Sequence, residues 1–397
     1  MAQTKYTLWS LSFVQVILMT FLFFLCMHML NASFPVYITN IHHNPAIGGM
    51  MMTAFMIASI VTRPFISMAL HKVSMKKTII LTLIGIFICI ALSYNRFSLP
   101  FLLVIRVLEG IGFGIITTIL ATMATTIAPK NRLGEGVGYF GMATSLGASL
   151  SPVVALALLH SASFNTILIV TFLIAACILV CCLLLSDVQL MIEPTVEKRT
   201  FVSAIYDKNA LLPSLLVFFL CVTFGGVFNF IDGLGGEVGL GAKVSWFFLI
   251  FMIIMLFIRP ISGRIFDKKS HEVLIYPAGI CGIAGLMLLS MTNHLWILII
   301  AGVCYGIAYG TMHPTLQAWA VRNVNVSKKG TANAMILTCM DLGMAIGSPT
   351  LGMIANHSGY RVMYGYSSIF IVVLLLIYLV ASRRNAVVVG TKKQRSV

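Results

Sequence analysis

Three ionisable residues stand within long apolar segments, where a charge is costly. Arg106 and Glu109 occur in LLVIRVLEGIGFG, and Asp341 occurs near the middle of ILTCMDLGMAIGSP. An arginine at the centre of a bilayer costs about 2.5–3.5 kcal/mol on insertion scales, so we expect Arg106 to face the protein interior and to have a partner. Glu109 follows three residues later and lies within reach on the same face of a helix.

The two intramembrane acids could carry protons. A carboxyl that is removed from water can bind and release a proton near neutral pH, as a proton carrier must. Their depth favours this role for Glu109 and Asp341, although Glu109 could instead form a helix-stabilising ion pair and Asp341 could be a hydrogen-bonded structural acid. Asp232 and Glu237, in FNFIDGLGGEVGLG, could line the mouth of a pathway or be solvated loop residues.

Aromatic and polar side chains with helical spacing could bind a small molecule. Tyr305, Tyr309 and His313 are spaced at i, i+4 and i+8, so they share one face of a helix. Such residues can stack on a substrate or hydrogen-bond it, although packing in the core is an equally good interpretation. His28 and Asn31, in the first apolar segment, are weaker candidates for substrate binding.

Motifs for other chemistry are missing from the sequence. It has no GxxxxGK[ST] loop for a nucleotide phosphate, and no Ser-His-Asp or paired-carboxylate arrangement typical of a hydrolase. The nine cysteines all lie in apolar segments without a Cys-x-x-Cys pair, which fits small buried hydrophobic residues better than disulfides or metal ligands. We therefore expect no cofactor, no metal site and no enzymatic activity.

The composition shows which elements must position these residues. The chain of 397 residues is 59% hydrophobic and 9% charged, whereas a soluble domain carries about 25% charged residues. A helix needs about 20 apolar residues to cross a bilayer. Twelve segments qualify, at residues 9–37, 46–70, 77–95, 99–127, 133–159, 164–186, 211–235, 243–266, 272–292, 295–321, 329–355 and 361–382. The sequence therefore predicts an all-α integral membrane protein with twelve transmembrane helices.

The basic residues indicate the orientation in the membrane. If the N-terminus is inside, most Lys and Arg residues fall in cytoplasmic segments, and only Arg96, Lys243 and Arg361 fall in outer loops. The positive-inside rule predicts this asymmetry, so we expect both termini in the cytoplasm. The net charge of +15 then reflects topology and does not indicate nucleic-acid binding.

The chain also contains an internal repeat. RPFISMALHKVS at 63–74 and RPISGRIFDKKS at 259–270 are offset by 196 residues. The same offset relates Gly110 to Gly306, Gly114 to Gly310, Gly134 to Gly330 and Gly147 to Gly343, and FFLC at 23–26 recurs at 218–221 with an offset of 195. Six helices per half give both halves the same orientation, so we expect the site between them at mid-depth. The predicted organisation is a six-helix bundle at 1–186, a cytoplasmic linker at 187–210, a second six-helix bundle at 211–382 and a basic tail at 383–397.

These features resemble the major facilitator superfamily over essentially the whole chain. That family carries a G-x-x-x-D-[RK]-x-G-[RK]-[RK] motif after its second helix and a weaker copy after its eighth. Here the better copy is the second, formed by Gly263, Asp267, Lys268 and Lys269, while His71 stands at the acidic position of the first. The resemblance implies that this loop gates the rocking of the two halves. The alternative is that the basic clusters only fix the topology.

Three arginines fit the same resemblance. Arg63 and Arg259, which open the two Arg-Pro segments, are assigned with the loops to the gate. The segment from Arg106 to Gly112 resembles the family's R-x-x-Q-G-x-G pattern, with Glu109 in place of Gln. Arg106 would then hold a carboxylate, either that of Glu109 or that of the substrate.

The fifth predicted helix bears on the direction of transport. Exporters of the family show a G-x8-G-x3-G-P-x2-G-G pattern there, a helix bend associated with antiport. Gly138, Gly147 and Pro152 match this pattern, and Leu156 departs from it. Pro152 removes a backbone donor and bends a helix, while the glycines permit close helix approach. The pattern favours export, although a bend can occur in any packed helix.

The resemblance implies a secondary transporter of the drug:proton antiporter type that works by alternating access. It would export a small organic molecule, either a drug-type compound or an endogenous metabolite such as an opine-type metallophore, in exchange for protons. The alternatives are a proton-coupled importer of a small nutrient and a non-transporting membrane sensor. The expected partners are the substrate, protons and the lipid bilayer of a bacterial plasma membrane, and we expect a monomer.

Overall fold

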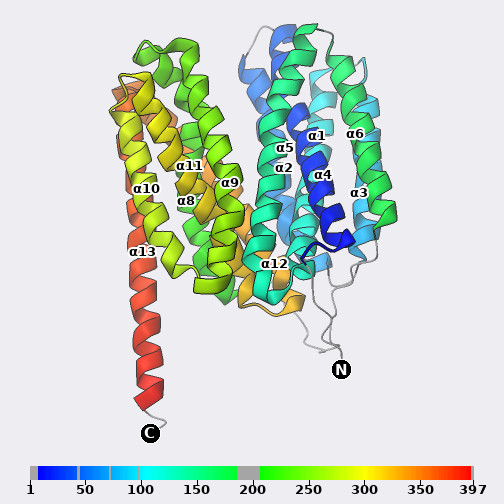
Figure 1. Cartoon of the computed structure of the whole chain (residues 1–397). Coiled ribbons are helices and arrows are strands. Elements are labelled where there is room, and N and C mark those ends of the chain that lie inside the picture. Colours follow the sequence, from blue (N-terminus) through cyan, green and yellow to red (C-terminus); the bar gives the residue numbers. More distant parts are fainter. Residues whose placement is uncertain are drawn as a thin grey trace. The chain divides into compact units, whose positions relative to one another are not determined.

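The computed structural model describes residues 8–42, 45–70, 73–95, 98–161, 163–185 and 206–394. All regular secondary structure in these ranges is helical (Figure 1). The chain divides into two compact units. Unit 1 contains Met1–Leu211 and Ala318–Thr338, and unit 2 contains Leu212–Gln317 and Cys339–Val397. The motif position His71 and most of the predicted linker lie outside the described residues.

The first six long helices belong to unit 1. They are α1 (Leu11–His42), α2 (Pro45–Ala69), α3 (Met75–Ser93), α4 (Leu99–Ile127), α5 (Leu133–Ser161) and α6 (Phe164–Leu184), with a short 3₁₀ turn, η1 (Lys130–Arg132), before α5. The hydroxyl of Ser74 accepts a hydrogen bond from the Lys77 backbone N–H at the start of α3, and Ser163 caps α6 through the Thr166 N–H in the same way. α1 packs against α2, α4, α5 and α6, and α4 packs against α2 and α3. α4 is thus held by several neighbours.

The later helices build unit 2. They are α8 (Lys208–Glu237), α9 (Ser245–Lys269), α10 (Glu272–Ser290), α11 (Leu295–Arg322), α12 (Lys329–Ser358) and α13 (Tyr360–Gln394), with 3₁₀ turns η2 (Gly241–Val244) and η3 (Val326–Lys328). The end of α11, η3 and the start of α12 fall in unit 1. α10 packs against α13 and α9.

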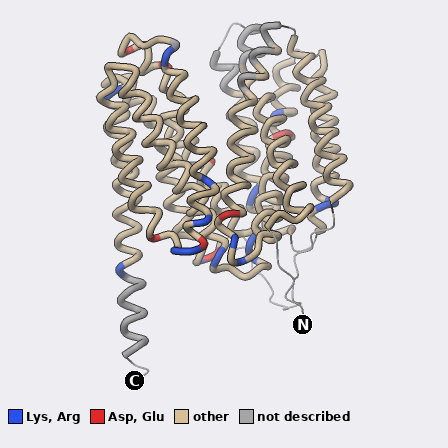
Figure 2. Tube along the Cα trace, in the orientation of Figure 1, with Lys and Arg blue, Asp and Glu red and all other residues tan. Residues whose placement is uncertain are grey.

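The helices suit a membrane. Eleven of the described helices are long and apolar enough to cross one. α5, rich in glycine and serine, is not among the eleven but occupies the fifth predicted segment. Large apolar side chains such as Leu81, Phe257 and Trp296 are mostly exposed, as lipid-facing side chains would be. Charged residues lie mainly near the helix ends (Figure 2). Each of the twelve predicted segments corresponds to a long helix, so the predicted all-α architecture is confirmed.

Close helix contacts confirm the 196-residue repeat. A Cβ atom on Gly110 of α4 would stand 2.3 Å from the carbonyl oxygen of Phe55 on α2. The repeat-equivalent Gly306 of α11 would place its Cβ 3.2 Å from the carbonyl oxygen of Phe251 on α9. Phe55 and Phe251 are themselves 196 residues apart, so the pairing of α2 with α4 recurs as the pairing of α9 with α11.

The FFLC match does not mark equivalent positions in the two halves. Gly147 of α5 packs on the carbonyl oxygen of Phe21 in α1, and Gly343 of α12 packs on that of Phe218 in α8. The two phenylalanines are 197 residues apart, so these contacts align α1 with α8 at an offset different from the 195 of the FFLC match. Runs of Phe and Leu match at several offsets in apolar helices, so a short match of this kind does not fix the register.

Polar contacts join the start of α12 to the rest of unit 1. Lys329 Nζ donates to the carbonyl oxygen of Thr125 near the end of α4 at 2.5 Å, and Asn333 Nδ2 donates to the Thr125 hydroxyl at 3.0 Å. The hydroxyls of Ser67 on α2 and Thr331 are 3.1 Å apart. We call these five residues the α12 cluster. Lys329 is only 8% exposed, so its ammonium relies on these partners in place of water.

Candidate functional site

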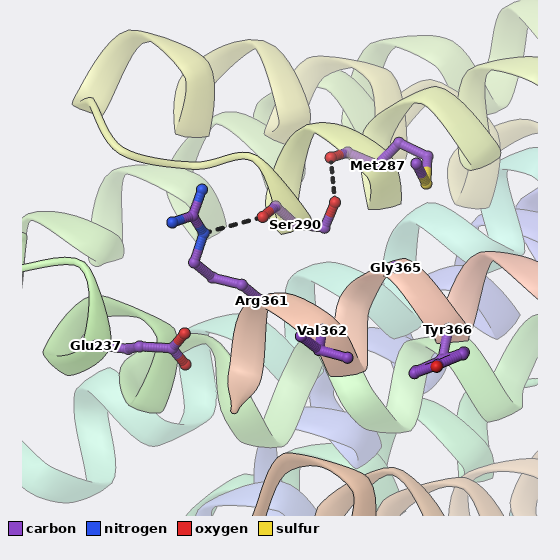
Figure 3. Close-up of a pocket in the computed structure, with 7 residues that line it drawn as sticks. All are labelled: Glu237, Met287, Ser290, Arg361, Val362, Gly365 and Tyr366. Atoms are coloured by element: carbon purple, nitrogen blue, oxygen red, sulfur yellow. Dashed lines mark hydrogen bonds between the residues drawn. The ribbon is translucent and has the colours of Figure 1, made fainter. Parts of the chain in front are cut away.

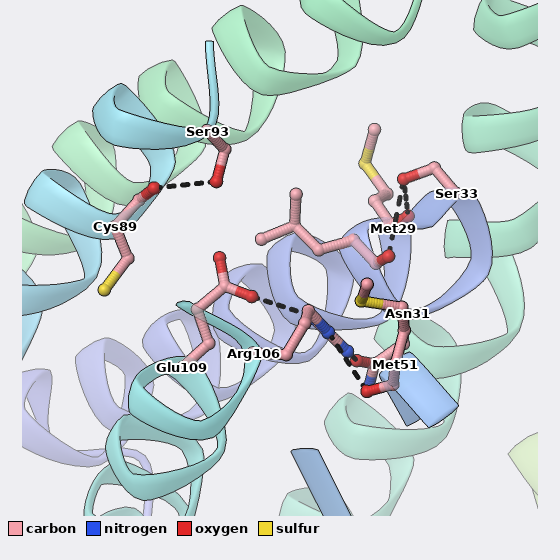
Figure 4. Close-up of polar contacts among 9 residues, drawn as sticks. Met29, Asn31, Ser33, Met51, Cys89, Ser93, Arg106 and Glu109 are labelled. Carbon is pink, nitrogen blue, oxygen red and sulfur yellow. Dashed lines mark hydrogen bonds and ion pairs between the residues drawn. The ribbon is translucent and has the colours of Figure 1, made fainter. Parts of the chain in front are cut away.

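Arg106 and Glu109 form the predicted ion pair on α4 (Figure 4). Arg106 Nη1 donates to Glu109 Oε2 at 2.6 Å, and neither side chain is exposed. Arg106 also donates through Nη2 to Oδ1 of Asn31 on α1, and through Nε to the carbonyl oxygen of Met51 on α2 at 3.5 Å. One helix therefore supplies the charge pair, and two neighbouring helices supply neutral acceptors.

Two aromatic rings add to the compensation of the Arg106 charge. Its Cζ atom lies 4.5 Å from the ring centroid of Phe55 and 4.9 Å from that of Phe34. A cation–π contact with a desolvated guanidinium contributes about 2 kcal/mol. An acid, an amide, a carbonyl group and two rings thus stabilise a single buried cation.

Glu109 uses only one of its two carboxylate oxygens. Oε2 accepts from Arg106, whereas Oε1 is buried and has no hydrogen-bond partner among the residues that the structure describes. Leaving a buried acceptor unpaired costs about 1–3 kcal/mol, and more for a charged group. Oε1 is therefore the atom of this pair at which a proton would be stabilising.

His28 lies among aromatic rings beside the ion pair. Its ring stacks on Phe24 with centroids 5.6 Å apart and meets Phe113 edge-on at 6.0 Å. It interacts electrostatically with Arg106. Asn31, by contrast, accepts a hydrogen bond from Arg106. Of the two substrate-binding candidates on α1, Asn31 is therefore the one that contacts the guanidinium group directly.

In unit 2, an aromatic cluster forms on the predicted face of α11. The rings of Tyr305 and Tyr309 stack with centroids 6.5 Å apart, and those of Tyr309 and His313 stack at 5.4 Å. Phe224 of α8 stacks on Tyr309 at 4.4 Å, and Phe251 of α9 lies about as close to both tyrosines, at 5.9 and 6.1 Å. Three helices therefore build this aromatic cluster, which consists of the five residues named here.

The polar atoms of the aromatic cluster are satisfied to different degrees. The Tyr305 hydroxyl lies 2.8 Å from the Thr223 hydroxyl and is fully buried. His313 Nε2 lies 3.2 Å from the Met340 sulfur, whereas its Nδ1 is buried without a hydrogen-bond partner in the described chain. Tyr305 thus has a structural partner, and His313 keeps one polar atom available.

Arg259 of α9, assigned to the gate from the sequence, lies at the aromatic cluster. It is 2% exposed, and it interacts electrostatically with Tyr309 and His313. Its Nη2 atom lies 3.3 Å from the Met255 sulfur, a weak acceptor. Its Nε and Nη1 atoms are buried and have no hydrogen-bond partner among the described residues.

The two other predicted acids lie in different surroundings. Asp341 of α12 is 3% exposed and interacts electrostatically with Cys221 of α8. Asp232 of α8 is exposed and interacts electrostatically with Tyr364 of α13. Asp341 is therefore a buried acid of unit 2, as Glu109 is of unit 1, whereas Asp232 is exposed.

The residues predicted for the gate are distributed along α2 and α9. Gly263 is buried, Asp267 is partly buried and Lys268 is exposed at the end of α9. Arg63 of α2 is 1% exposed, and its Cζ atom lies 6.0 Å from the ring centroid of Phe113. Phe113 is the repeat equivalent of Tyr309, so both Arg-Pro arginines lie near an aromatic residue of the neighbouring helix.

Gly147 of α5 allows close contact with another helix, as the residue type predicted. Gly138 is buried, and a Cβ atom on Gly147 would stand 2.6 Å from the carbonyl oxygen of Phe21 on α1. The side chains of Pro152 and Leu156 lie outside the described part of the chain.

A separate cavity of about 640 Å³ lies among α8, α10 and α13 (Figure 3). Its lining consists of Glu237, Met287, Ser290, Arg361, Val362, Gly365 and Tyr366. Arg361 Nε donates to the Ser290 carbonyl oxygen at 3.0 Å, and the Tyr360 backbone N–H donates to Glu237 Oε2 at 2.5 Å. Glu237 thus satisfies an N–H at the start of α13, a stabilising position for an acid. None of the other predicted site residues lines this cavity.

Sequence reasoning missed the aromatic and backbone partners of Arg106. Met51, Phe34 and Phe55 come from α1 and α2, and no local spacing connects them with α4. The repeat offered one indication, since Phe55 and Phe251 are equivalent positions. Phe55 contacts Arg106 in unit 1, and Phe251 contacts Tyr309 in unit 2. Among the described residues, no group of three His, Cys, Asp or Glu side chains could hold a metal ion.

Apolar helices of membrane-spanning length, with buried charges and aromatic clusters among them, indicate a multi-pass membrane protein. The sequence matches the family model described as "Major Facilitator Superfamily" over residues 16–348 and 274–396. The chain belongs to the Major Facilitator Superfamily, and it is a membrane transporter, not an enzyme.

Curated relatives of the chain include exporters. It is 25% identical over 299 residues to an uncharacterized transporter of this type from Methanocaldococcus jannaschii, which covers 72% of this chain and 76% of the relative. It is 21% identical over 382 residues to the staphylopine export protein of Staphylococcus aureus, covering 92% and 94%. It is 24% identical over 164 residues to the multidrug resistance protein MdtG of Klebsiella pneumoniae, covering 41% and 40%.

Solved structures share the fold. The human organic anion transporter MFSD10 superposes with a TM-score of 0.77 at 16% identity, covering 92% of this chain and 98% of that one. The Escherichia coli fucose:proton symporter FucP superposes with a TM-score of 0.73 at 14% identity, covering 92% and 97%. The fold therefore occurs in proteins of different transport type.

Proposed function

We propose that this transporter exports a small organic molecule in exchange for protons, by alternating access. The observation that carries the proposal is the buried carboxyl of Glu109, whose Oε2 binds Arg106 and whose Oε1 has no partner in the described chain. Protonation at Oε1 would cancel the negative charge and weaken the ion pair, and loss of the proton would restore it. A group with two charge states inside an apolar helix is what proton coupling requires.

Asp341 is the second proton-coupling acid in this proposal. It is 3% exposed in unit 2, as Glu109 is buried in unit 1. One proton that moves through 100 mV provides about 2.3 kcal/mol, enough to drive uphill export of a solute. Each unit would then contribute one acid whose charge depends on the side from which protons arrive.

Export is favoured over import by two observations. The staphylopine export protein is similar to this chain over 92% of this chain's length, and Gly138 and Gly147 fit the fifth-helix pattern of exporters. A drug-type compound and an opine-type metabolite are both compatible substrates. The alternative is a proton-coupled importer of a small nutrient, since a fucose:proton symporter has the same fold.

We also propose a gate and an orientation. Gly263, Asp267 and Lys268, together with Arg63, would act at the cytoplasmic ends of the helices, with Gly138, Gly147 and Pro152 allowing α5 to bend. Both termini would lie in the cytoplasm of a bacterial cell, and the transporter would work as a monomer. Green fluorescent protein fused to the C-terminus should then fluoresce, whereas alkaline phosphatase fused there should be inactive.

The main test uses inside-out membrane vesicles with an acidic lumen and a fluorescent probe of the pH gradient. A substrate added outside should enter the lumen in exchange for protons and should collapse the gradient. Lipophilic cations form one series and carboxylate-rich metabolites another. If the gradient collapses only when a substrate is loaded inside the lumen, the transporter is an importer and the proposal is wrong.

Two variants separate loss of coupling from loss of folding. Glu109→Gln and Asp341→Asn keep the size of each side chain and remove its charge. Each should abolish substrate-driven proton release while retaining exchange of labelled for unlabelled substrate, which needs no net proton movement. Proton release that persists in both variants would contradict the assigned roles of Glu109 and Asp341.

A further inference from the structure

We infer that Arg259 and His313 bind a carboxylate-containing part of the transported molecule, so that the substrate is an amino- or hydroxycarboxylate. The inference rests on the proposed function, because it names the substrate class of that same transporter. The inference goes beyond the proposed function because it assigns the anion-binding groups to unit 2, on α9 and α11, and not to the Arg106–Glu109 pair.

The first step is that the charge of Arg259 is buried and uncompensated. The side chain is 2% exposed, and within the described chain the only hydrogen-bond contact of its donors is the Met255 sulfur at 3.3 Å from Nη2. Among the same residues Nε and Nη1 have no acceptor, and Arg259 forms no ion pair. A buried guanidinium normally has an acid or several hydrogen-bond acceptors. The missing acceptor is therefore expected from a ligand.

The second step is that His313 offers a complementary atom within electrostatic range of Arg259. The two side chains interact electrostatically, and both lie on helices that pack closely at Gly306 and Gly310. His313 Nδ1 is buried and has no partner in the described chain, while Nε2 contacts the Met340 sulfur. A neutral ring whose Nε2 carries the proton presents Nδ1 as an acceptor for an N–H or O–H group.

The third step concerns the surface next to these atoms. The Tyr309 ring stacks with Phe224, at 4.4 Å, and with His313, at 5.4 Å. Aromatic rings of this kind suit an apolar or planar part of a small molecule. The combined chemistry is a carboxylate for Arg259, an N–H or O–H group near that carboxylate for His313, and an apolar portion for the rings.

Other charged groups argue against a cationic substrate at this position. The buried acid of unit 2, Asp341, is not an ion-pair partner of Arg259, so the guanidinium charge is not neutralised. A lipophilic cation would be repelled by it, whereas a carboxylate would form charge-assisted hydrogen bonds. Arg106 does not need a substrate carboxylate, because Glu109 and Asn31 already accept from it.

The test measures binding to the purified full-length transporter by thermal unfolding, followed through tryptophan fluorescence. The probes are alanopine and octopine, which are iminodicarboxylates of the opine type, and citrate, a hydroxycarboxylate. Two matched controls are the dimethyl ester of alanopine, which lacks the anionic charge, and glutarate, which lacks the N–H or O–H group. Tetraphenylphosphonium represents lipophilic cations. Alanopine, octopine or citrate should raise Tm with saturation, and the ester should not.

Variants connect the binding to the two residues. Arg259→Met should weaken alanopine binding by about 100-fold, the scale for loss of a buried charged partner, and should raise the Tm of the unliganded protein because it removes an uncompensated charge. Arg264→Met removes an exposed positive charge from the same helix and should leave the binding unchanged. His313→Asn should weaken the binding of alanopine more than that of glutarate.

The outcomes distinguish this inference from the proposed function. Failure of all three substrate-class probes to raise Tm, or unchanged binding in Arg259→Met, overturns the inference. Cation-driven proton release in vesicles, with no carboxylate binding, overturns the inference and leaves proton-coupled export standing. Carboxylate binding that depends on Arg259, without proton release in vesicles, supports the inference and contradicts the proposed antiport.

Discussion

Unit 1 buries Arg63 and Arg106, unit 2 buries Arg259, and the charges of Arg106 and Arg259 are compensated differently. Arg106 has an acid at 2.6 Å, two neutral acceptors and two aromatic rings. Arg259 is as deeply buried, but its donors contact only a sulfur atom and two of its nitrogens have no acceptor in the described chain. Folding alone would favour the first arrangement, because an unpaired buried charge reduces stability.

The repeat makes this comparison more specific. The positions equivalent to Arg106 and Glu109, 196 residues later, are Gly302 and Tyr305. Unit 2 therefore lacks the ion pair of α4 and has a neutral phenol where unit 1 has its acid. Since the backbone pairing of these helices is the same, the difference lies in the side chains. This division favours proton chemistry in unit 1 at this position and ligand binding next to Tyr309 in unit 2.

The largest expected effect follows from removing the acid of the Arg106–Glu109 ion pair. Glu109→Leu leaves the Arg106 guanidinium buried with only neutral acceptors and should reduce the free energy of unfolding by about 3–5 kcal/mol. The measurement is the thermal midpoint of the purified transporter, followed by tryptophan fluorescence. Unit 1 would then contain a buried cation without an acid, compensated only by neutral acceptors and aromatic rings.

A matched control exists in the same unit. Arg132 and Glu135 have the same i, i+3 spacing and a distance of 2.7 Å, but the Arg132 side chain is 35% exposed. Glu135→Leu should cost about 1 kcal/mol or less, because water can solvate the remaining guanidinium. The double variant Arg106→Met/Glu109→Leu should recover most of the stability lost in Glu109→Leu. Equal losses for Glu109→Leu and Glu135→Leu would contradict the distinct role of the buried pair.

An intermediate effect tests the helix packing that the repeat reproduces in both units, α2 against α4 and α9 against α11. Alanine at Gly110 would place its Cβ atom 2.3 Å from the Phe55 carbonyl oxygen, which can move only with the α2 backbone. Gly110→Ala should therefore cost about 1–3 kcal/mol, as overpacking does. The nearest atoms to a Cβ at Gly306 are side-chain carbons of Ile254 at 3.1 Å.

Gly306→Ala is the matched variant, and it should have a small effect of either sign. A shift of a few tenths of an ångström at Ile254 and at the Phe251 carbonyl group of α9 would accommodate the methyl group, and replacing glycine in a helix contributes about 1 kcal/mol in the opposite direction. Thermal unfolding of both variants under identical conditions measures the difference. If Gly306→Ala were the more destabilising of the two, α9 and α11 would be packed more tightly than α2 and α4.

Local patterns were sufficient to predict much of this molecule. Hydropathy located the twelve helices, since a membrane span requires a long apolar segment. The i, i+3 spacing brought Glu109 to Arg106, and the i, i+4 spacing brought Tyr305, Tyr309 and His313 to one face of α11. These are contacts within one helix, whose geometry is fixed by 3.6 residues per turn.

Contacts between helices were not predictable in the same way. The sequence grouped Arg259 with the gate because it stands before a basic loop, and only tertiary packing brings it to the aromatic cluster of α11. The register of α1 against α5 also depended on glycine contacts, which FFLC did not reveal. Whether a buried charge is satisfied depends on neighbours from several helices, and no spacing along one helix contains that information.

The smallest expected effect concerns Tyr305, the residue of unit 2 at the position of Glu109. Its hydroxyl lies 2.8 Å from that of Thr223, which also donates to the Leu220 carbonyl oxygen at 2.7 Å. Tyr305→Phe removes one neutral hydrogen bond and leaves Thr223 with a partner. It should lower the free energy of unfolding by only about 0.5–1.5 kcal/mol.

Tyr305→Phe should also leave substrate-driven proton release in vesicles unchanged, because a neutral phenol that is fixed by Thr223 does not need to change its charge during transport. Thr223→Val serves as the matched control, since it removes the same hydrogen bond from the other side. The two single variants and the double variant should show a coupling energy close to the value of one hydrogen bond. If Tyr305→Phe abolished proton release while Thr223→Val retained it, the phenol itself would take part in coupling. The two units would then share proton chemistry at equivalent positions, and the division of roles between the Arg106 and Arg259 sites would be wrong.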